Sequence, residues 1–164
     1  MKKWQLGYVF VVITIAFFFS LGKAIADSGN STQTIIQHLE FLGYQCKKLD
    51  QGIKATHPSK LGFLLIVLKD GLMAQSALAG IPPKPSASKG GTNPKGYGRF
   101  SALNALNKES TISRFFWTDS GELVVRASIL GTYDKGRFYT FMEAWEKDGQ
   151  AIGKHYKALK PYLK

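Results

Sequence analysis

The sequence has very little of what most catalytic sites are built from. Its 164 residues include one cysteine, Cys46, and three histidines that stand far apart, at His38, His57 and His155. A single cysteine excludes an internal disulfide and a cysteine zinc cluster, and the histidine spacing matches no metal-binding motif. No Gly-x-Ser-x-Gly elbow, Walker loop or complete dinucleotide fingerprint occurs. The sequence therefore predicts no catalytic residue, no metal site, no cofactor and no enzymatic activity.

Cys46 stands beside Lys47 and Lys48, and neighbouring cations lower the pKa of an exposed thiol. A position in a short strand more often buries a thiol, so an unreactive Cys46 is the favoured interpretation.

Acidic residues are also scarce. The chain holds 11 Asp and Glu against 22 Lys and Arg, which gives a formal net charge of +11. Residues 1–26 contain three of the lysines and no acid, so the rest of the chain keeps a side-chain charge of +8. Such an excess attracts acidic or phosphate-rich partners, although it also serves simply to keep a protein in solution.

Only one long apolar run occurs, and it lies at the start of the chain. Residues 6–19 are apolar apart from one threonine, Lys2 and Lys3 precede them, and Ala24-Ile25-Ala26 offers a small-residue cleavage site. This layout predicts a signal peptide over residues 1–26 and an exported protein, periplasmic or secreted. The alternative is an uncleaved membrane anchor, since residues 4–22 carry no charge.

Proline is concentrated in one segment, residues 80–98, together with glycine, serine and three lysines. Nothing in this composition can bury a face, so it predicts a long loop. The functional alternative is a basic loop that orders on contact with a partner, through Lys84, Lys89 and Lys95.

The rest of the chain is patterned like an ordinary globular domain. Apolar spacing predicts a first helix over about residues 32–42, and short runs with turn residues predict a meander of three or four antiparallel strands between residues 44 and 78. Within the meander, the unbroken apolar run 61–68 is typical of a strand buried on both faces. A short helix at about 100–109 and a hairpin (112–118 and 122–130) follow.

The last predicted element is one long amphipathic helix from Asp134, its N-cap, to about residue 158, with a break near Asp148-Gly149 as an alternative. Lys154, Lys157 and Lys160 recur near its end. They suit an anionic membrane surface or a polyanion, but a basic helix end is also favoured by the helix dipole alone.

The order helix, meander, helix, hairpin, long helix, together with short motifs from residue 103 onward, resembles the YbjN family, whose domains look like type III secretion chaperones. The motifs are Leu103-Asn104-Ala105-Leu106-Asn107, Arg114-Phe115-Phe116, Asp119-Ser120-Gly121 with Leu123-Val124-Val125, and Gly131 before the last helix. The resemblance covers about residues 32–158. It implies one domain over residues 27–164, an α+β fold in the order α-β-β-β-(β)-α-β-β-α, with helices packed on an antiparallel sheet.

The resemblance further implies a protein or peptide partner and allows a homodimer, because chaperones of similar fold bind extended segments of other proteins and are often dimeric. The candidate partner-binding residues are Phe115, Phe116, Trp117 and Arg126 in the hairpin. Which of Phe115 and Trp117, or Phe116, faces the helices is left open, and the exposed set is the candidate surface. The alternative function is a basic protein that binds an anionic membrane or a polyanion through the six lysines named above; nucleic acid is the less favoured polyanion.

Overall fold

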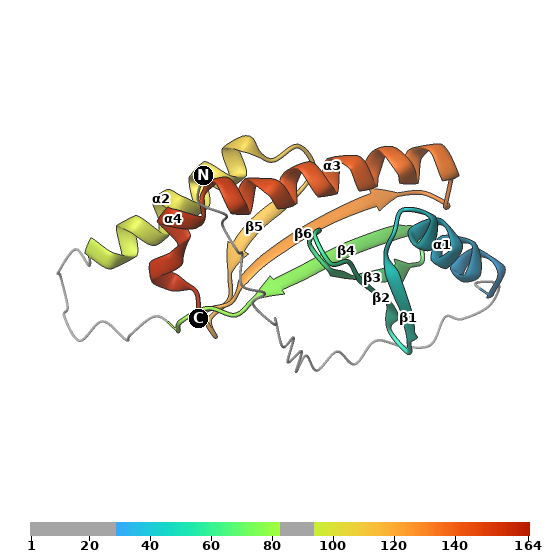
Figure 1. Cartoon of the computed structure of the whole chain (residues 1–164), viewed down its shortest axis with the longest axis horizontal. Coiled ribbons are helices and arrows are strands. Elements are labelled where there is room, and N and C mark those ends of the chain that lie inside the picture. Colours follow the sequence, from blue (N-terminus) through green and yellow to red (C-terminus); the bar gives the residue numbers. More distant parts are fainter. Residues whose placement is uncertain (1–28, 83–93) are drawn as a thin grey trace, which may run out of the picture.

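The computed structural model describes residues 29–82 and 94–164, so the predicted signal peptide lies outside the described residues. A six-stranded antiparallel sheet carries helices on one face (Figure 1). The elements are α1 (Gly29–Phe41), β1 (Gln45–Leu49), β2 (Gly52–Thr56), β3 (Phe63–Leu68), β4 (Gly71–Leu78), α2 (Pro94–Glu109), β5 (Arg114–Trp117), β6 (Leu123–Leu130), α3 (Lys135–Lys154), α4 (Tyr156–Leu159) and a 3-10 turn, η1 (Lys160–Tyr162). The predicted α+β class and the order of helices and strands are confirmed.

The strands lie in the order β1-β2-β3-β4-β6-β5. The first four form the predicted meander, and the second hairpin joins it through β6, which pairs with β4 over eight residues. The shorter strand β5 is therefore an edge strand, and β1 is the other edge.

The first helix packs its apolar stripe against the start of the meander. Ile35, Ile36 and Leu39 are buried in the core, at the spacing expected for one helix face. The helix closes through backbone bonds from Gly43 and Tyr44 to the last turn, and Gly43 has φ +87°. A residue with a Cβ is strained at that angle, which is why a glycine ends this helix.

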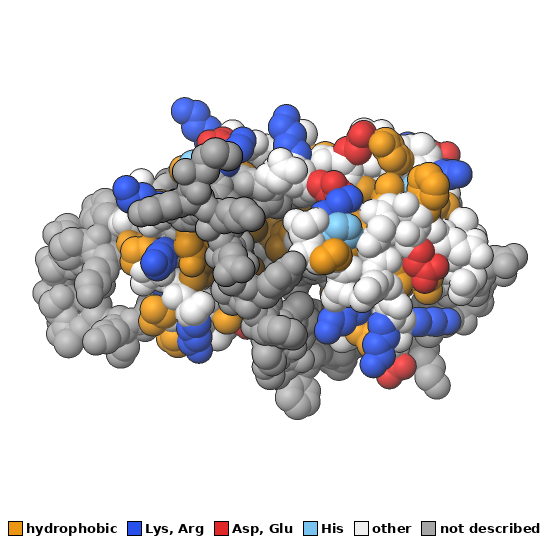
Figure 2. All heavy atoms as spheres, viewed as in Figure 1, with side chains coloured by type: hydrophobic (Ala, Val, Ile, Leu, Met, Phe, Trp, Pro, Cys, Tyr) orange, Lys and Arg blue, Asp and Glu red, His pale blue; other side chains and the backbone are white. Residues whose placement is uncertain are grey.

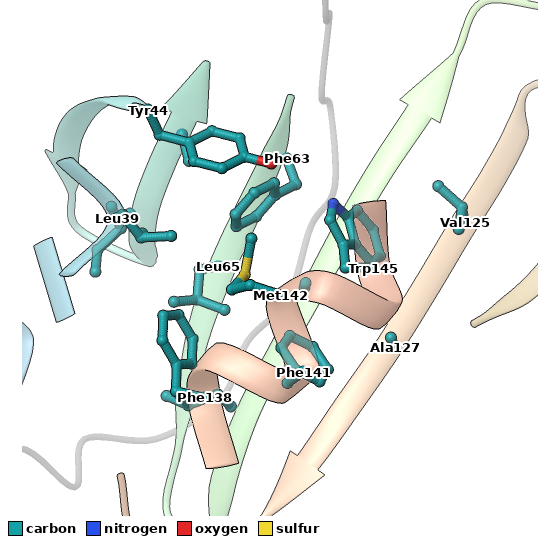
Figure 3. Packing of buried hydrophobic residues seen from close by; sticks show 14 of the residues in the cluster. Leu39, Tyr44, Phe63, Leu65, Val125, Ala127, Phe138, Phe141, Met142 and Trp145 are labelled. Atoms are coloured by element: carbon teal, nitrogen blue, oxygen red, sulfur yellow. The ribbon is translucent and has the colours of Figure 1, made fainter. Parts of the chain in front are cut away.

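The long helix α3 runs along the same face of the sheet and fills the centre of the core (Figures 1 and 3). It begins at the predicted cap, where Asp134 accepts a hydrogen bond of 2.8 Å from the Arg137 backbone. Its apolar stripe is buried against the strands: Phe138, Phe141, Met142, Trp145 and Ala151. Residues from α1, α2 and α4 belong to this same core cluster, so all four described helices cover one face.

Two helix boundaries differ from the predictions. The second helix begins at Pro94, inside the segment predicted as a loop, because the fixed φ of proline suits the first helical position. The long helix passes through Gly149 without a break and ends at Lys154, where α4 follows after His155. A side chain at Gly149 would press on Leu61, so this glycine lets α3 lie close to the loop before β3.

None of the described helices is both long and apolar enough to cross a membrane.

Two helix side chains hold the edge strand β5 in place. The side-chain amide of Asn107 donates to the Phe115 carbonyl at 3.0 Å and accepts from its N–H at 2.9 Å, as a neighbouring strand would. Asp148 on α3 is 1% exposed and accepts the backbone N–H groups of residues 111–113 at 2.7, 3.0 and 2.8 Å. Burial raises the pKa of Asp148, but these backbone donors lower it, and the net pKa lies below its usual value.

Candidate functional site on the open face of the sheet

The hairpin register answers the question that the sequence left open. Phe115 and Trp117 pair with Val125 and Leu123 and point toward the helices, whereas Phe116 lies on the other side. Phe115 is only 2% exposed. Since every described helix lies on the opposite side, we call the sheet face that carries Phe116 the open face.

Trp117 is enclosed by neighbours on the helical side. The Arg99 guanidinium lies 4.0 Å from the centroid of its ring, and the Tyr162 ring packs edge-on at 6.3 Å. Arg99 also donates to the Gly121 carbonyl at 3.0 Å. These contacts join the hairpin turn to α2 and the C-terminal segment, so Trp117 stabilises this junction.

Phe116 and Arg126, by contrast, both lie on the open face and are joined there. The Arg126 guanidinium sits 5.3 Å from the Phe116 ring centroid. Its Nε and Nη2 atoms donate to Gln75 Oε1 at 2.9 and 2.6 Å. The guanidinium is therefore held by a neutral amide and an aromatic ring, which fixes its position without neutralising its charge.

Arg126 belongs to a single line of directly paired residues that crosses all six strands. From β1 to β5 this line, the cross-strand row, consists of Lys47, Lys54, Leu64, Gln75, Arg126 and Arg114. Because directly paired residues project to the same side of a sheet, all six belong to the open face.

The cross-strand row has two cations at each end. Lys47 is paired directly with Lys54, and Arg114 with Arg126, and all four side chains are exposed. Like charges in directly opposite positions destabilise a sheet. None of the four forms an ion pair with a described carboxylate, and none of the six strands contains an Asp or Glu. The open face therefore carries four uncompensated cations.

Between the two cationic pairs the open face is largely apolar. Leu64 and Val124 project to this side but are buried, with only 8% and 4% exposed, so the accessible apolar surface comes from their half-buried neighbours Ile66, Met73 and Ala77. The pairs Ile66 with Met73 and Ala77 with Val124 flank the row on neighbouring lines. A hollow of about 270 Å³ opens here, and Lys47, Lys54, Leu64, Gln75 and Ala77 contribute to its lining.

The strand β3 is less uniformly buried than its unbroken apolar run predicts. Phe63, Leu64 and Leu65 are buried, but Val67 and Leu68 at its end are 37% and 45% exposed. Leu130, at the end of β6, is 74% exposed. Leu68 and Leu130 lie on the open face, so its apolar surface continues to this end of the sheet, whereas Val67 pairs with Leu72 on the helical side.

Of the six lysines of the alternative function, the three whose side chains are described, Lys154, Lys157 and Lys160, lie away from the open face, on the C-terminal helical segment. Lys84 and Lys89 lie outside the described residues, and Lys95 falls in the first turn of α2, where only the backbone is described. Lys154 lies 3.9 Å from Glu109 on the helical side, while Lys157 and Lys160 are exposed on α4 and η1. Figure 2 shows a separate gathering of Lys and Arg side chains over the β1–β2 hairpin at the lower right.

The histidines and the cysteine have separate neighbours. His38 bonds the Tyr133 hydroxyl at 2.9 Å, His57 accepts from the Ser59 backbone at 3.1 Å, and His155 meets Glu109 at 2.9 Å. Burial raises the pKa of the Cys46 thiol to about 11, which keeps it protonated near neutral pH. No group of His, Cys, Asp and Glu in the described part of the chain is arranged to hold a metal ion.

Two members of this site, Phe116 and Arg126, were predicted from the sequence, and the others were not: Lys47, Lys54, Gln75 and Arg114. A partial signal was present, since the two predicted strands of the hairpin carry Arg114 and Arg126, and Glu122 at the start of the second strand is their one acid. Which strands lie side by side, and in which register, was not available from that pattern.

Comparison with known proteins identifies the fold. No family model matches the chain, and no curated protein does. Among solved structures, the chain is similar to YbjN, a proposed transcription regulator from E. coli, with 17% identity and a TM-score of 0.55 over 80% of this chain and 94% of that one. It is also similar to an uncharacterized protein from Methanothermobacter thermautotrophicus, with 12% identity and a TM-score of 0.52 over 77% and 97% of the two chains. The chain has a YbjN-like fold.

Proposed function

We propose that this protein is an exported, non-enzymatic module that binds a segment of a polypeptide partner on the open face of its sheet. One observation carries the proposal: the described helices all cover one face, while the other presents apolar side chains beside a guanidinium held by Gln75 and Phe116. Interfaces combine these elements, an apolar centre with aromatic and arginine anchors.

The YbjN-like fold supports a binding role, since one of the two similar structures is described as a proposed transcription regulator. Export rests on the leader over residues 1–26. Mass measurement of the protein recovered outside the cytoplasm tests this part, with loss of the leader as the expected result.

The test of binding is an array of short random peptides, probed with the full-length chain. We expect a subset of peptides to bind, and Phe116→Ala to weaken their binding by about tenfold, because buried interface aromatics commonly contribute more than 1 kcal/mol. Phe41→Ala is the matched control, since Phe41 is 81% exposed on α1, away from the open face. Equal losses for both variants, or for neither, would contradict the proposal.

The second candidate is binding to an anionic surface through Lys157 and Lys160, which are exposed near the C-terminus. It predicts binding to vesicles of anionic lipid that falls steeply with added salt, because contacts between exposed charges are screened. Substitution of both lysines by glutamine abolishes that binding if this candidate is correct, whereas Phe116→Ala leaves it unchanged.

A further inference from the structure

We propose that the segment bound on the open face is acidic, with carboxylates at both ends of a short apolar centre. This inference rests on the proposed function and adds the chemistry of the partner. The carboxylates would meet the two cationic pairs of the cross-strand row, and the apolar centre would lie over Ile66, Met73 and Ala77, the half-buried residues beside Leu64.

The charge arrangement carries the inference. Each end of the row sets two cations directly opposite one another, Lys47 with Lys54 and Arg114 with Arg126. A sheet that only needed solubility could separate these charges or pair them with acids, which would avoid the repulsion. A bound carboxylate at each end relieves it, so the free energy of the repulsion becomes part of the driving force for binding.

The Arg126 side chain is already held in place for contact with a carboxylate. Gln75 occupies its Nε and Nη2 atoms, which leaves Nη1 to donate to a carboxylate on the open face. The Arg126 guanidinium carbon also lies over the Phe116 ring, 5.3 Å from its centroid. Less conformational entropy is lost on binding when the side chain is already held in place.

The spacing of the two cationic pairs sets the length of the segment. Four strand spacings separate their midpoints in the order β1-β2-β3-β4-β6-β5, and neighbouring strands lie about 4.8 Å apart, so the pairs are ~19 Å apart. An extended chain advances about 3.3 Å per residue, so roughly six residues span that distance.

A polypeptide fits this face better than a nucleic acid or a bilayer. Sheets that bind single-stranded nucleic acid stack bases on several aromatic rings, whereas Leu64, Ile66, Met73 and Val124 are aliphatic and Phe116 is the one aromatic residue among the described open-face strand positions. The part of the site between β1 and β4 is also a hollow of about 270 Å³, which a flat lipid surface cannot enter.

The experiment measures fluorescence anisotropy of a labelled synthetic peptide, Asp-Asp-Leu-Val-Ser-Leu-Asp-Asp, with the full-length chain. Two further peptides replace the aspartates by asparagine or by lysine. We expect the aspartate peptide to bind at least about tenfold more tightly than the asparagine peptide, and the lysine peptide not to bind, with the preference reduced by added salt.

Charge reversal at the row supplies the matched variants. Lys47→Glu, Lys54→Glu and Arg126→Glu should each weaken binding of the aspartate peptide by about tenfold or more. Lys48→Glu is the control, because Lys48 is the exposed neighbour of Lys47 on the same strand and projects to the other side. The double variant of Lys47 and Lys54 to glutamate should gain binding of a peptide with lysines at one end only. Melting temperatures establish that each variant is folded.

The outcomes separate this inference from the proposed function. Equal affinity for the aspartate and asparagine peptides, with Phe116→Ala still weakening both, would sink the acidic partner and leave the binding face standing. If Lys48→Glu weakens binding as much as Lys47→Glu, the row has no special role. Tighter binding of oligothymidylate or anionic vesicles, lost in the same row variants, would overturn the choice of a polypeptide. If no peptide on the array depends on Phe116, both proposals fail.

Discussion

The two faces of this sheet are made from alternate residues of the same strands, yet they differ in almost every physical property. On the helical side, Ile53, Leu65 and Ala74 are fully buried, in one core cluster with aromatic side chains of α3. On the open face, the neighbouring residues of the same strands include Lys54 and Gln75. On the helical side, burial of apolar surface offsets the conformational entropy that the chain loses on folding. On the open face, like charges stand directly opposite one another, which lowers the stability of the sheet. A surface that costs stability is more readily explained by what it binds than by what it holds together.

The largest expected effect lies on the helical side. Trp145 is 1% exposed and packs edge-on against Phe63 with ring centroids 5.4 Å apart. Trp145→Ala should lower the free energy of unfolding by about 3–5 kcal/mol, because it removes a large buried side chain and leaves a cavity. Urea denaturation measures this. Phe116→Ala on the open face should cost about 1 kcal/mol; equal costs would break the contrast between the two faces.

The next effect concerns the carboxylate that fixes the hairpin to α3. Asp148→Asn should lower the free energy of unfolding at pH 7 by about 2–3 kcal/mol, since three backbone N–H groups lose a charged acceptor. The pKa of Asp148 is lowered in the folded state, so its contribution is present above the unfolded-state pKa and is lost as the pH falls through the folded-state value. The difference between wild type and variant should therefore shrink below pH 3.8, the ordinary value. A constant difference across that range would show that the charge is not involved.

A smaller effect compares two neighbouring positions on β1. Cys46 pairs with Ala55 on the helical side, and Lys47 lies on the open face. The pKa of the Cys46 thiol is raised from 9.0 to about 11, so its thiolate fraction near pH 8 is about 100-fold below that of an ordinary thiol. Alkylation by iodoacetamide should be correspondingly slow. The double variant Cys46→Ser with Lys47→Cys should react at the rate of a free thiol, and similar rates at the two positions would argue against the assigned orientation of β1.

The smallest effect tests the cost of the like-charge pairs. Lys54→Glu turns the pair of Lys47 and Lys54 into an ion pair of opposite charges, which should raise the free energy of unfolding by about 0.3–1 kcal/mol. The gain should fade with added salt. Thermal denaturation at low and high ionic strength measures it. A variant that becomes more stable while losing the acidic peptide would show that the cationic pair is kept for binding; a less stable variant would remove the argument from repulsion.

Much of the fold could be predicted from the sequence, but most of the site could not. Leu123, Val125 and Ala127 stand at alternate positions of the sequence, and in the structure all three are buried on the helical side of β6. The predicted cap at Asp134 is also confirmed. These features depend on residues a few positions apart, whose spacing decides what shares a face.

The choice between Phe115 and Phe116 needed the register of β5 on β6 and the position of α2, because a shift of one residue exchanges the two faces. Trp117 was placed among the candidate contacts without knowledge of Arg99 or Tyr162, which reach it from distant parts of the chain. The second helix was predicted at about residues 100–109, but its start at Pro94 was missed because proline and glycine content indicates a loop, although proline is well suited to the first turn.

The sequence by itself determined the class of the fold, the order of its elements and the excess of basic charge, since these follow from local spacing and from composition. Only the tertiary structure decided where that charge matters. Residues as far apart along the chain as Lys47 and Arg126 fall on one row because backbone hydrogen bonds set six strands side by side in one register. No local pattern specifies that alignment.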